Sequence, residues 1–188
     1  MDDEEARERI VEAADARYYA RGFASVGMDE IRDAAGVSLR RIYRLFPSKD
    51  DLVLAVLDRR HELWSAAVED RVTRESTPAG RLLAIYDYLA DWFGDDAFRG
   101  CGFINAFGEL GGADPKVAEA ARRHKASFQA YLATLADAAG APPSLAPQLA
   151  ILAEGAQTTA AIAGTPEAAA QARAAAEVLI SAALPVAA

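Results

Sequence analysis

The chain has 188 residues, of which 52% are hydrophobic, and its formal net charge at pH 7 is −8. This composition excludes a disordered chain and allows one or two domains with a proper hydrophobic core. Apolar runs fall short of the roughly 20 residues of a membrane-spanning helix and the start is acidic rather than signal-like, so we expect a cytoplasmic protein without a membrane partner.

The first predicted helix runs from about residue 4 to residue 20. Ile10, Ala14 and Tyr18 fall on one stripe at helical spacing, and Gly22 is suited to end the helix. The acidic residues before this stripe leave no basic arm at the front of the chain.

Residues 28–46, "MDEIRDAAGVSLRRIYRLF", hold the most informative pattern. They predict two short helices joined by a tight turn, in which Gly36 ends the first helix and Ser38 caps the second. The apolar residues of the second helix can face inward, which leaves a largely outward set: Arg40, Arg41, Tyr43 and Arg44. A short helix with a cationic outer face, braced by another helix across a glycine-containing turn, fits the DNA major groove. This pattern predicts a helix-turn-helix that binds DNA.

The distribution of charge agrees with this interpretation. Between Ser38 and Lys49 the chain has four cations and no acidic residue, namely Arg40, Arg41, Arg44 and Lys49. A local basic surface on an acidic protein is typical of a focused DNA contact, and the acidic remainder argues against broad, non-specific nucleic-acid binding.

The rest of the chain also predicts helices, since no strand with a period of two residues and a hairpin turn is evident. Ser48 caps a long helix over residues 49–74, and the segment "ESTPAG" follows as a linker. Further helices are predicted at about 78–93, 98–110, 115–139, 145–163 and 166–184. The fold class is therefore all-α, with about nine helices by periodicity.

The last two predicted helices are dominated by alanine. Small side chains let helices approach closely, so this pair is either part of the core of one chain or a dimer interface that packs against its copy as a four-helix bundle. One short recognition helix contacts little DNA, and two-fold pairing on a palindromic site would solve that problem.

Three segments in order, "IVEAADARYYARGF", "MDEIRDAAGVS" and "IYRLFPSKDDLVLAVL", resemble the DNA-binding domain of the TetR/AcrR family of bacterial transcriptional regulators. The resemblance implies an all-helical homodimer in which the N-terminal three-helix domain binds DNA and the C-terminal helical domain binds a ligand and dimerises. It also implies repression that a small molecule relieves. The expected division is a DNA-binding domain over 1–50 with its motif at 27–46, a linking helix over 49–74, and a ligand-binding and dimerisation domain over 75–188.

The family's DNA-contacting positions correspond here to Ser38, Leu39, Arg40, Arg41, Tyr43, Arg44 and Lys49. The resemblance assigns phosphate contacts, which set affinity and register, to Tyr43 and Lys49. Arg40 and Arg41 are candidates for base contacts, because an arginine can present two donors to guanine O6 and N7. The alternative for each arginine is a solvated helix face.

Several positions depart from the family's pattern. Leu39 stands where lysine is frequent, Arg40 where glycine is frequent, and Leu45 where histidine is common. Val26 and Gly27 replace the usual threonine or serine before the second helix, so its cap would rest on backbone amides. These departures affect which operator sequence is read, and the acidic front end is not expected to enter the minor groove.

A ligand pocket is expected among the central helices. Its candidate effector-binding residues are Trp64, Tyr88, Trp92, Phe103, Asn105, Phe107 and Phe128, with Glu109 and Gln129 as further polar anchors. The alternative is that these aromatic residues form ordinary core. Their character favours an apolar or aromatic effector over a highly charged one.

Neither a metal nor a cofactor is expected. Cys101 is the single cysteine, which excludes an intramolecular disulfide and favours a quiet buried thiol over a redox sensor. His61 and His124 are too few for a convincing metal site. His124 is expected on a solvated, basic helix face, with contact to an anionic ligand group as the alternative.

Two other classes of function remain. A catalytic role has no support, because no phosphate loop, dinucleotide fingerprint or nucleophile elbow is present. A helical ligand-binding or scaffold protein that no longer binds DNA is the alternative, and Tyr43, Lys49 and the recognition-helix arginines speak against it. The prediction is a sequence-specific regulator, most simply a repressor released from its operator by a small, largely apolar effector.

Overall fold

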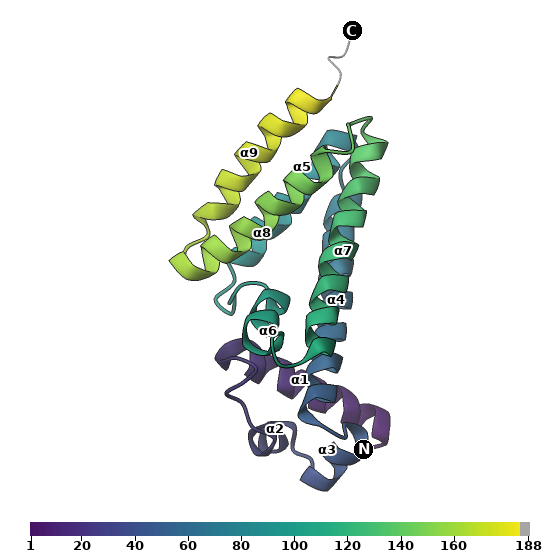
Figure 1. The fold of residues 1–188 in the computed structure, drawn as a ribbon, viewed down its shortest axis with the longest axis vertical. Coiled ribbons are helices and arrows are strands. Elements are labelled where there is room, and N and C mark those ends of the chain that lie inside the picture. Colours follow the sequence, from purple (N-terminus) through teal and green to yellow (C-terminus); the bar gives the residue numbers. More distant parts are fainter. Residues whose placement is uncertain (185–188) are drawn as a thin grey trace. The chain divides into compact units, whose positions relative to one another are not determined.

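The computed structural model describes residues 1–184, and within that range the chain forms nine α-helices and no strand (Figure 1). In chain order they are α1 (Asp3–Arg21), α2 (Met28–Ala35), α3 (Leu39–Leu45), α4 (Lys49–Thr73), α5 (Pro78–Phe93), α6 (Gly102–Leu110), α7 (Pro115–Ala138), α8 (Leu145–Ala163) and α9 (Glu167–Ala183). The predicted all-α fold class is confirmed. The last four residues of the expected C-terminal domain, 185–188, lie outside the described part.

Capping interactions set the helix boundaries around the motif as the sequence predicts. Gly36 adopts a left-handed conformation with φ 65° and ends α2. Ser38 Oγ accepts a hydrogen bond of 3.3 Å from the backbone amide of Arg41 at the start of α3. Ser48 and Asp51 cap α4 reciprocally, each side chain accepting from the other's backbone amide, at 3.0 and 3.1 Å.

The predicted helix at 98–110 begins four residues later in the structure, at Gly102. The cause is the turn before it, in which Asp95 Oδ1 accepts a bond of 2.8 Å from the amide of Ala97 and Gly100 has a φ of 84°. A positive φ cannot continue a right-handed helix, and the spacing of aromatic residues alone does not reveal it.

The chain divides into two compact units, which are described separately. The first unit comprises residues 1–62 and 102–123, and the second comprises 63–101 and the residues from 124 onward. Both α4 and α7 therefore contribute one part of their length to each unit.

The core of the first unit forms where α1 packs on α2 and α3. Its largest buried side chains are Ile10, Tyr18, Phe23, Ile31, Ile42 and Phe46, none of them more than 1% exposed. The rings of Tyr18 and Phe23 stack with centroids 5.2 Å apart. Burial of each such side chain stabilises the fold by about 1.5–3 kcal/mol, so α3 is held firmly by its inner face.

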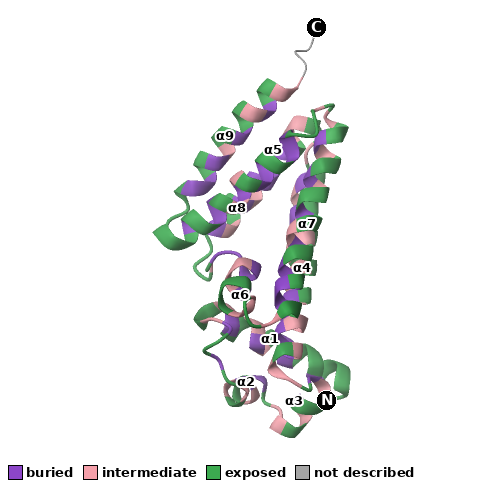
Figure 2. Cartoon of the chain, viewed as in Figure 1, coloured by how far each residue is buried: buried purple, intermediate pink, exposed green. Residues whose placement is uncertain are grey.

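The second unit has its core between α5, α8 and α9. Leu82, Ile85, Leu89 and Leu149 are completely buried there. Tyr86 donates a buried hydrogen bond of 2.8 Å to the backbone carbonyl of Leu149, so its hydroxyl is satisfied. Buried and exposed residues alternate around each of these helices, as Figure 2 shows. Within residues 1–184, no helix is both long enough and apolar enough to span a membrane.

Candidate nucleic-acid interface

The helix-turn-helix is built from α2, a short turn and α3. The N-cap of α2 is Gly27, which makes no side-chain capping bond, as the missing serine or threonine predicts. At the other end, the amides of Gly36 and Val37 both donate to the carbonyl of Arg32, at 3.0 and 3.4 Å. These bonds close the turn and set the direction in which α3 leaves it.

One face of α3 is buried and the opposite face is exposed. Ile42 within the helix and Phe46 at its end are buried, while Leu39 and Leu45 are half-buried. The exposed residues are Ser38, Arg40, Tyr43 and Arg44. Arg7 of α1 stacks its guanidinium 4.3 Å from the centre of the Phe46 ring and donates to the carbonyl of Leu45 at 3.0 Å. These two contacts hold the C-terminal end of α3 against α1.

Arg41 differs from the other arginines of α3 because it is half-buried, with 25% of its side chain exposed. Its Nη2 atom donates to Asp3 Oδ1 at 2.9 Å and to the backbone carbonyls of Met1 and Asp2 at 3.0 and 2.6 Å. Arg44 Nη2 donates to the same Asp3 oxygen at 2.5 Å. These bonds, first that from Arg41, lower the pKa of the Asp3 carboxyl below its usual value. The acidic start of the chain therefore lies on α3, a contact that the sequence did not indicate.

Lys49, at the first position of α4, is also half-buried. Its Nζ donates to the carbonyl of Ala24 at 3.3 Å and lies 5.7 Å from the centre of the Tyr18 ring. Burial lowers the pKa of this ammonium, and the negative charges of Asp50 and Glu109 oppose the shift. The structure thus gives Lys49 a role in holding the turn between α1 and α2.

Glu109 of α6, one of the predicted polar anchors for an effector, also contacts this turn. Its Oε2 accepts a hydrogen bond of 2.8 Å from the backbone amide of Ala24. The same carboxylate lies against Gly22, where an added Cβ would come within 3.0 Å of it. No sequence motif indicates this contact, because it joins residues 85 positions apart.

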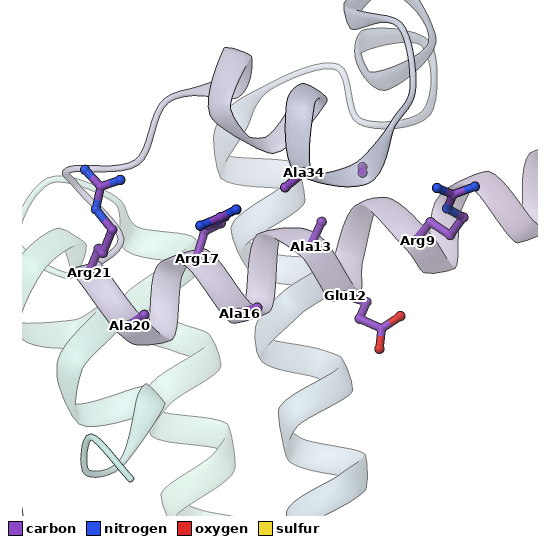
Figure 3. A pocket seen from close by; sticks show the side chains of 9 residues that line it. Arg9, Glu12, Ala13, Ala16, Arg17, Ala20, Arg21 and Ala34 are labelled. Carbon is purple, nitrogen blue, oxygen red and sulfur yellow. The ribbon is translucent and has the colours of Figure 1, made fainter. Parts of the chain in front are cut away.

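A shallow groove of about 370 Å³ runs along the outer side of α1, next to α2 (Figure 3). Alanines at positions 13, 16, 20 and 34 leave the space, and Arg9, Arg17 and Arg21 stand around it. Arg21 is paired with Glu30 at 2.6 Å. Glu12 also lines the groove, so charges of both signs surround it.

The predicted effector residues fall into both units. Trp64, Tyr88, Trp92 and Phe128 lie in the second unit, and Phe103, Asn105 and Phe107 lie on α6 in the first. The four residues of the second unit form a continuous aromatic cluster. Trp64 meets Phe128 and Tyr88 at centroid distances of 5.1 and 6.3 Å, and Tyr88 stacks on Trp92 at 6.3 Å. On α6, Phe103 is buried and Phe107 is exposed, as is Gln129 on α7.

A cavity of about 170 Å³ adjoins this cluster. It is lined by Trp64, Ser65, Val68, Glu69, Ser127, Phe128 and Tyr131. Its volume is below the roughly 300 Å³ at which typical small-molecule sites begin, so it suits a ligand of one or two rings. Of the predicted pocket residues, Trp64 and Phe128 line it.

Cys101 and His124 are both buried in the second unit. The Cys101 sulfur lies 3.6 Å from Lys125 Nζ, a neighbour that the sequence did not suggest. His124 packs edge-on against Trp64, with ring centroids 5.2 Å apart. The expectation of a solvated His124 is therefore wrong: its side chain is buried, although Arg122 and Arg123 directly before it are exposed. Within residues 1–184, no group of three histidine, cysteine or acidic side chains is placed to hold a metal ion.

Comparison with known proteins identifies similar chains over both units. The sequence profile of "Bacterial regulatory proteins, tetR family" matches residues 10–56, and that of "Tetracyclin repressor-like, C-terminal domain" matches residues 78–176. The crystal structure of a TetR-family transcriptional regulator from Streptomyces coelicolor is 29% identical, with a TM-score of 0.89 over 97% of each chain.

Two curated relatives match part of the chain. The activator FasR of Mycolicibacterium smegmatis is 34% identical over 94 residues, 50% of this chain and 43% of that protein. The regulator TtgR of Pseudomonas putida is 42% identical over 59 residues, 31% of this chain and 28% of that protein. The chain thus spans less than half the length of either relative.

Proposed function

This chain belongs to the TetR family of bacterial regulatory proteins, and we propose that it is a repressor that a small, largely apolar effector releases from a palindromic operator. Its helix-turn-helix binds DNA, and the proteins it resembles are transcription regulators rather than enzymes. It acts where the chromosome is, in the cytoplasm.

The observation that carries this proposal is the orientation of α3. Ile42 is buried and the Ser38 cap is formed, so α3 exposes Arg40, Tyr43 and Arg44 on its outer face. Arginine is suited to read guanine in the major groove, where a bidentate contact discriminates against other bases by about 1–3 kcal/mol. In this proposal Arg40 and Arg41 read bases, and Tyr43 and Lys49 contact phosphates.

A dimer through α8 and α9 is part of the proposal. Large apolar side chains stand exposed on both helices, with Ile151 at 70%, Ile162 at 83% and Val178 at 68%. On α8, Gly155 and Thr158 lie between the two isoleucines at helical spacing and are exposed too. Exposed apolar patches of this kind mark interaction sites, and small residues allow close helix approach. Two copies of the α8 and α9 pair would bury these residues in a four-helix bundle.

The effector site is proposed at the aromatic cluster of the second unit. The 170 Å³ cavity beside Trp64 and Phe128 is walled by rings and has Glu69 as its acidic group. Such a site favours a compact apolar or aromatic molecule over an anion, since an anion would lose hydration and meet the like charge of Glu69.

Release from DNA would follow from a small movement of α4. That helix runs without a break from Lys49, beside the motif, to Thr73, and includes Trp64 and Val68 of the cavity wall. In a dimer, the recognition helices must lie about one DNA turn apart, or a little more, to enter successive major grooves. A pivot of α4 on effector binding would change that spacing and weaken DNA binding.

Selection of bound sites from a random duplex library, with purified protein at near-physiological salt, tests this function. A recovered palindrome confirms a sequence-specific dimer, and its half-site spacing measures the separation of the recognition helices. No enrichment by folded protein contradicts the proposal. Since FasR is named as an activator, a reporter downstream of the recovered site then decides the direction: transcription that rises on loss of the protein supports repression.

A further inference from the structure

The two arginines at positions 41 and 44 share one carboxylate oxygen, Asp3 Oδ1, at 2.9 and 2.5 Å. Arg41 has two further acceptors in the carbonyls of Met1 and Asp2, and its Nε is buried without a partner among the described residues. Arg44 remains 60% exposed and reaches back from the outer face of α3 to Asp3. The first residues of the chain therefore accept hydrogen bonds from guanidinium groups that could also bind DNA.

A carboxylate and a DNA phosphate compete for the same guanidinium donors. Both present anionic oxygens that accept charge-assisted hydrogen bonds from arginine, and one N–H cannot serve both at once. Building on the proposed DNA-binding function, we propose that Asp3 is a specificity-determining residue, which keeps Arg41 and Arg44 from DNA phosphates until a matching base pair replaces it.

Asp3 affects selectivity because the free energy of replacing it by DNA as the partner of Arg41 and Arg44 differs between matching and non-matching duplexes. On a non-matching duplex the arginines find only phosphate oxygens, which offer the same kind of bond as Asp3 and no gain for leaving it. On a matching duplex a guanine offers two acceptors in register with both donors of the fork, and the exchange becomes favourable. Asp3 thus weakens non-specific binding more than specific binding.

The surroundings of Asp3 allow the exchange to occur readily. Its side chain is 56% exposed, and an exposed ion pair is weak and screened by salt. The helix does not depend on it for its cap, because Asp2 Oδ1 accepts from the amide of Glu5 at 2.9 Å. Asp3 can therefore release both arginines without unwinding α1, and Arg41 must in addition leave the carbonyls of Met1 and Asp2.

The test compares Asp3→Asn with Glu4→Gln in the full chain. Both substitutions remove one negative charge from the first turn of α1, where Asp3, Glu4 and Glu5 lie together, so their effects on helix dipole and net charge match. Binding of each protein is measured on the duplex selected by the wild type and on an unrelated duplex, at several salt concentrations. Circular dichroism melting confirms that the variants are folded.

We expect Asp3→Asn to bind the unrelated duplex several-fold more tightly, with a smaller gain on the selected duplex, so that the ratio of the two affinities falls. The salt slope on the unrelated duplex should steepen by about one to two, as further phosphates are neutralised. Glu4→Gln should shift both affinities equally. In an Arg44→Gln background, the effect of Asp3→Asn on the ratio should shrink, because part of it acts through Arg44.

Failure of the role proposed for Asp3 can be distinguished from failure of the proposed DNA-binding function. An unchanged affinity ratio in Asp3→Asn, with a selective wild type, overturns the inference alone. Weaker binding of Asp3→Asn to the selected duplex overturns the inference as well. It would mean that Asp3 orients Arg41 and Arg44 toward the bases. A wild type that binds all duplexes equally, or none, contradicts the proposed function and the inference with it.

Discussion

Glu109 accepts a hydrogen bond of 2.8 Å from the backbone amide of Ala24, which joins α6 to the turn that leads into the helix-turn-helix. Lys49 donates to the carbonyl of the same Ala24 at 3.3 Å. The peptide groups of this turn are thus held by one acidic and one basic side chain from helices that lie far from it in the sequence. Substitutions at Glu109 and Lys49 should therefore affect the turn directly and the recognition helix only indirectly.

Glu109→Ala should destabilise the turn between α1 and α2. The lost bond is charge-assisted but lies near the surface, so we expect a loss of about 1 kcal/mol in the free energy of unfolding of the DNA-binding part. Hydrogen exchange of the Ala24 amide gives the sharper measurement and should speed up. In Glu109→Gln, which keeps an acceptor oxygen, the exchange rate of the Ala24 amide should lie between those of the wild type and Glu109→Ala. Unchanged protection of Ala24 in Glu109→Ala would show that the bond does not persist in solution.

Arg40→Ala and Tyr43→Phe should weaken DNA binding in different ways. Loss of a bidentate guanine contact should cost about 1–3 kcal/mol on the selected duplex and relax preference at one base pair. Loss of the Tyr43 hydroxyl should weaken all duplexes alike, because a phosphate contact carries no sequence information. Binding measured against single-base variants of the selected site separates the two patterns. Equal and uniform losses from both would remove Arg40 from base reading.

Ile151→Glu and Ile162→Glu should convert a dimer to monomers, because each places a charge in the proposed four-helix interface. Light scattering coupled to size-exclusion chromatography measures the mass directly. Leu63→Glu is the matched control, since Leu63 is also an exposed large hydrophobic residue but lies on α4. The interface would be misplaced if all three variants kept the mass of the wild type.

Trp64 should report on occupancy of the cavity in the second unit. The chain has two tryptophans, so Trp92→Phe leaves Trp64 as the single one. A cavity near 150 Å³ can hold a benzene-sized molecule, and the cavity of about 170 Å³ beside Trp64 is of similar size. We therefore expect indole to change the Trp64 fluorescence saturably. The same titration with a charged benzoate should do so far less. An identical response to both probes would contradict an apolar site.

The pairing of Asp3 with Arg41 and Arg44 should persist through the neutral pH range and fail in acid. The carboxyl has a folded-state pKa below its ordinary value of 3.8, so its contribution is fully present above that value and is lost as pH falls through the lowered pKa. The selectivity difference between wild type and Asp3→Asn should therefore stay constant from pH 6 to pH 8. A difference that changes across this range would point to another titrating group.

The sequence by itself determined the motif and, apart from the start of α6, the helices. Caps at Ser38 and Ser48, the left-handed Gly36 and the buried face through Ile42 are local features, readable from residue type and spacing within a few turns of chain. For the same reason the exposure of Arg40 and Tyr43 could be predicted, because the buried face of a short amphipathic helix leaves one direction open.

Tertiary structure decided which partners these residues have. Asp3 meets Arg41 across 38 positions, Glu109 meets Ala24 across 85, and His124 turns inward to Trp64 although its neighbours in sequence are basic and exposed. Periodicity predicts which side of a helix is buried, but it does not predict which distant side chain arrives there. Two carboxylates of equal charge can therefore have different roles, one on the recognition helix and the other on the turn before it.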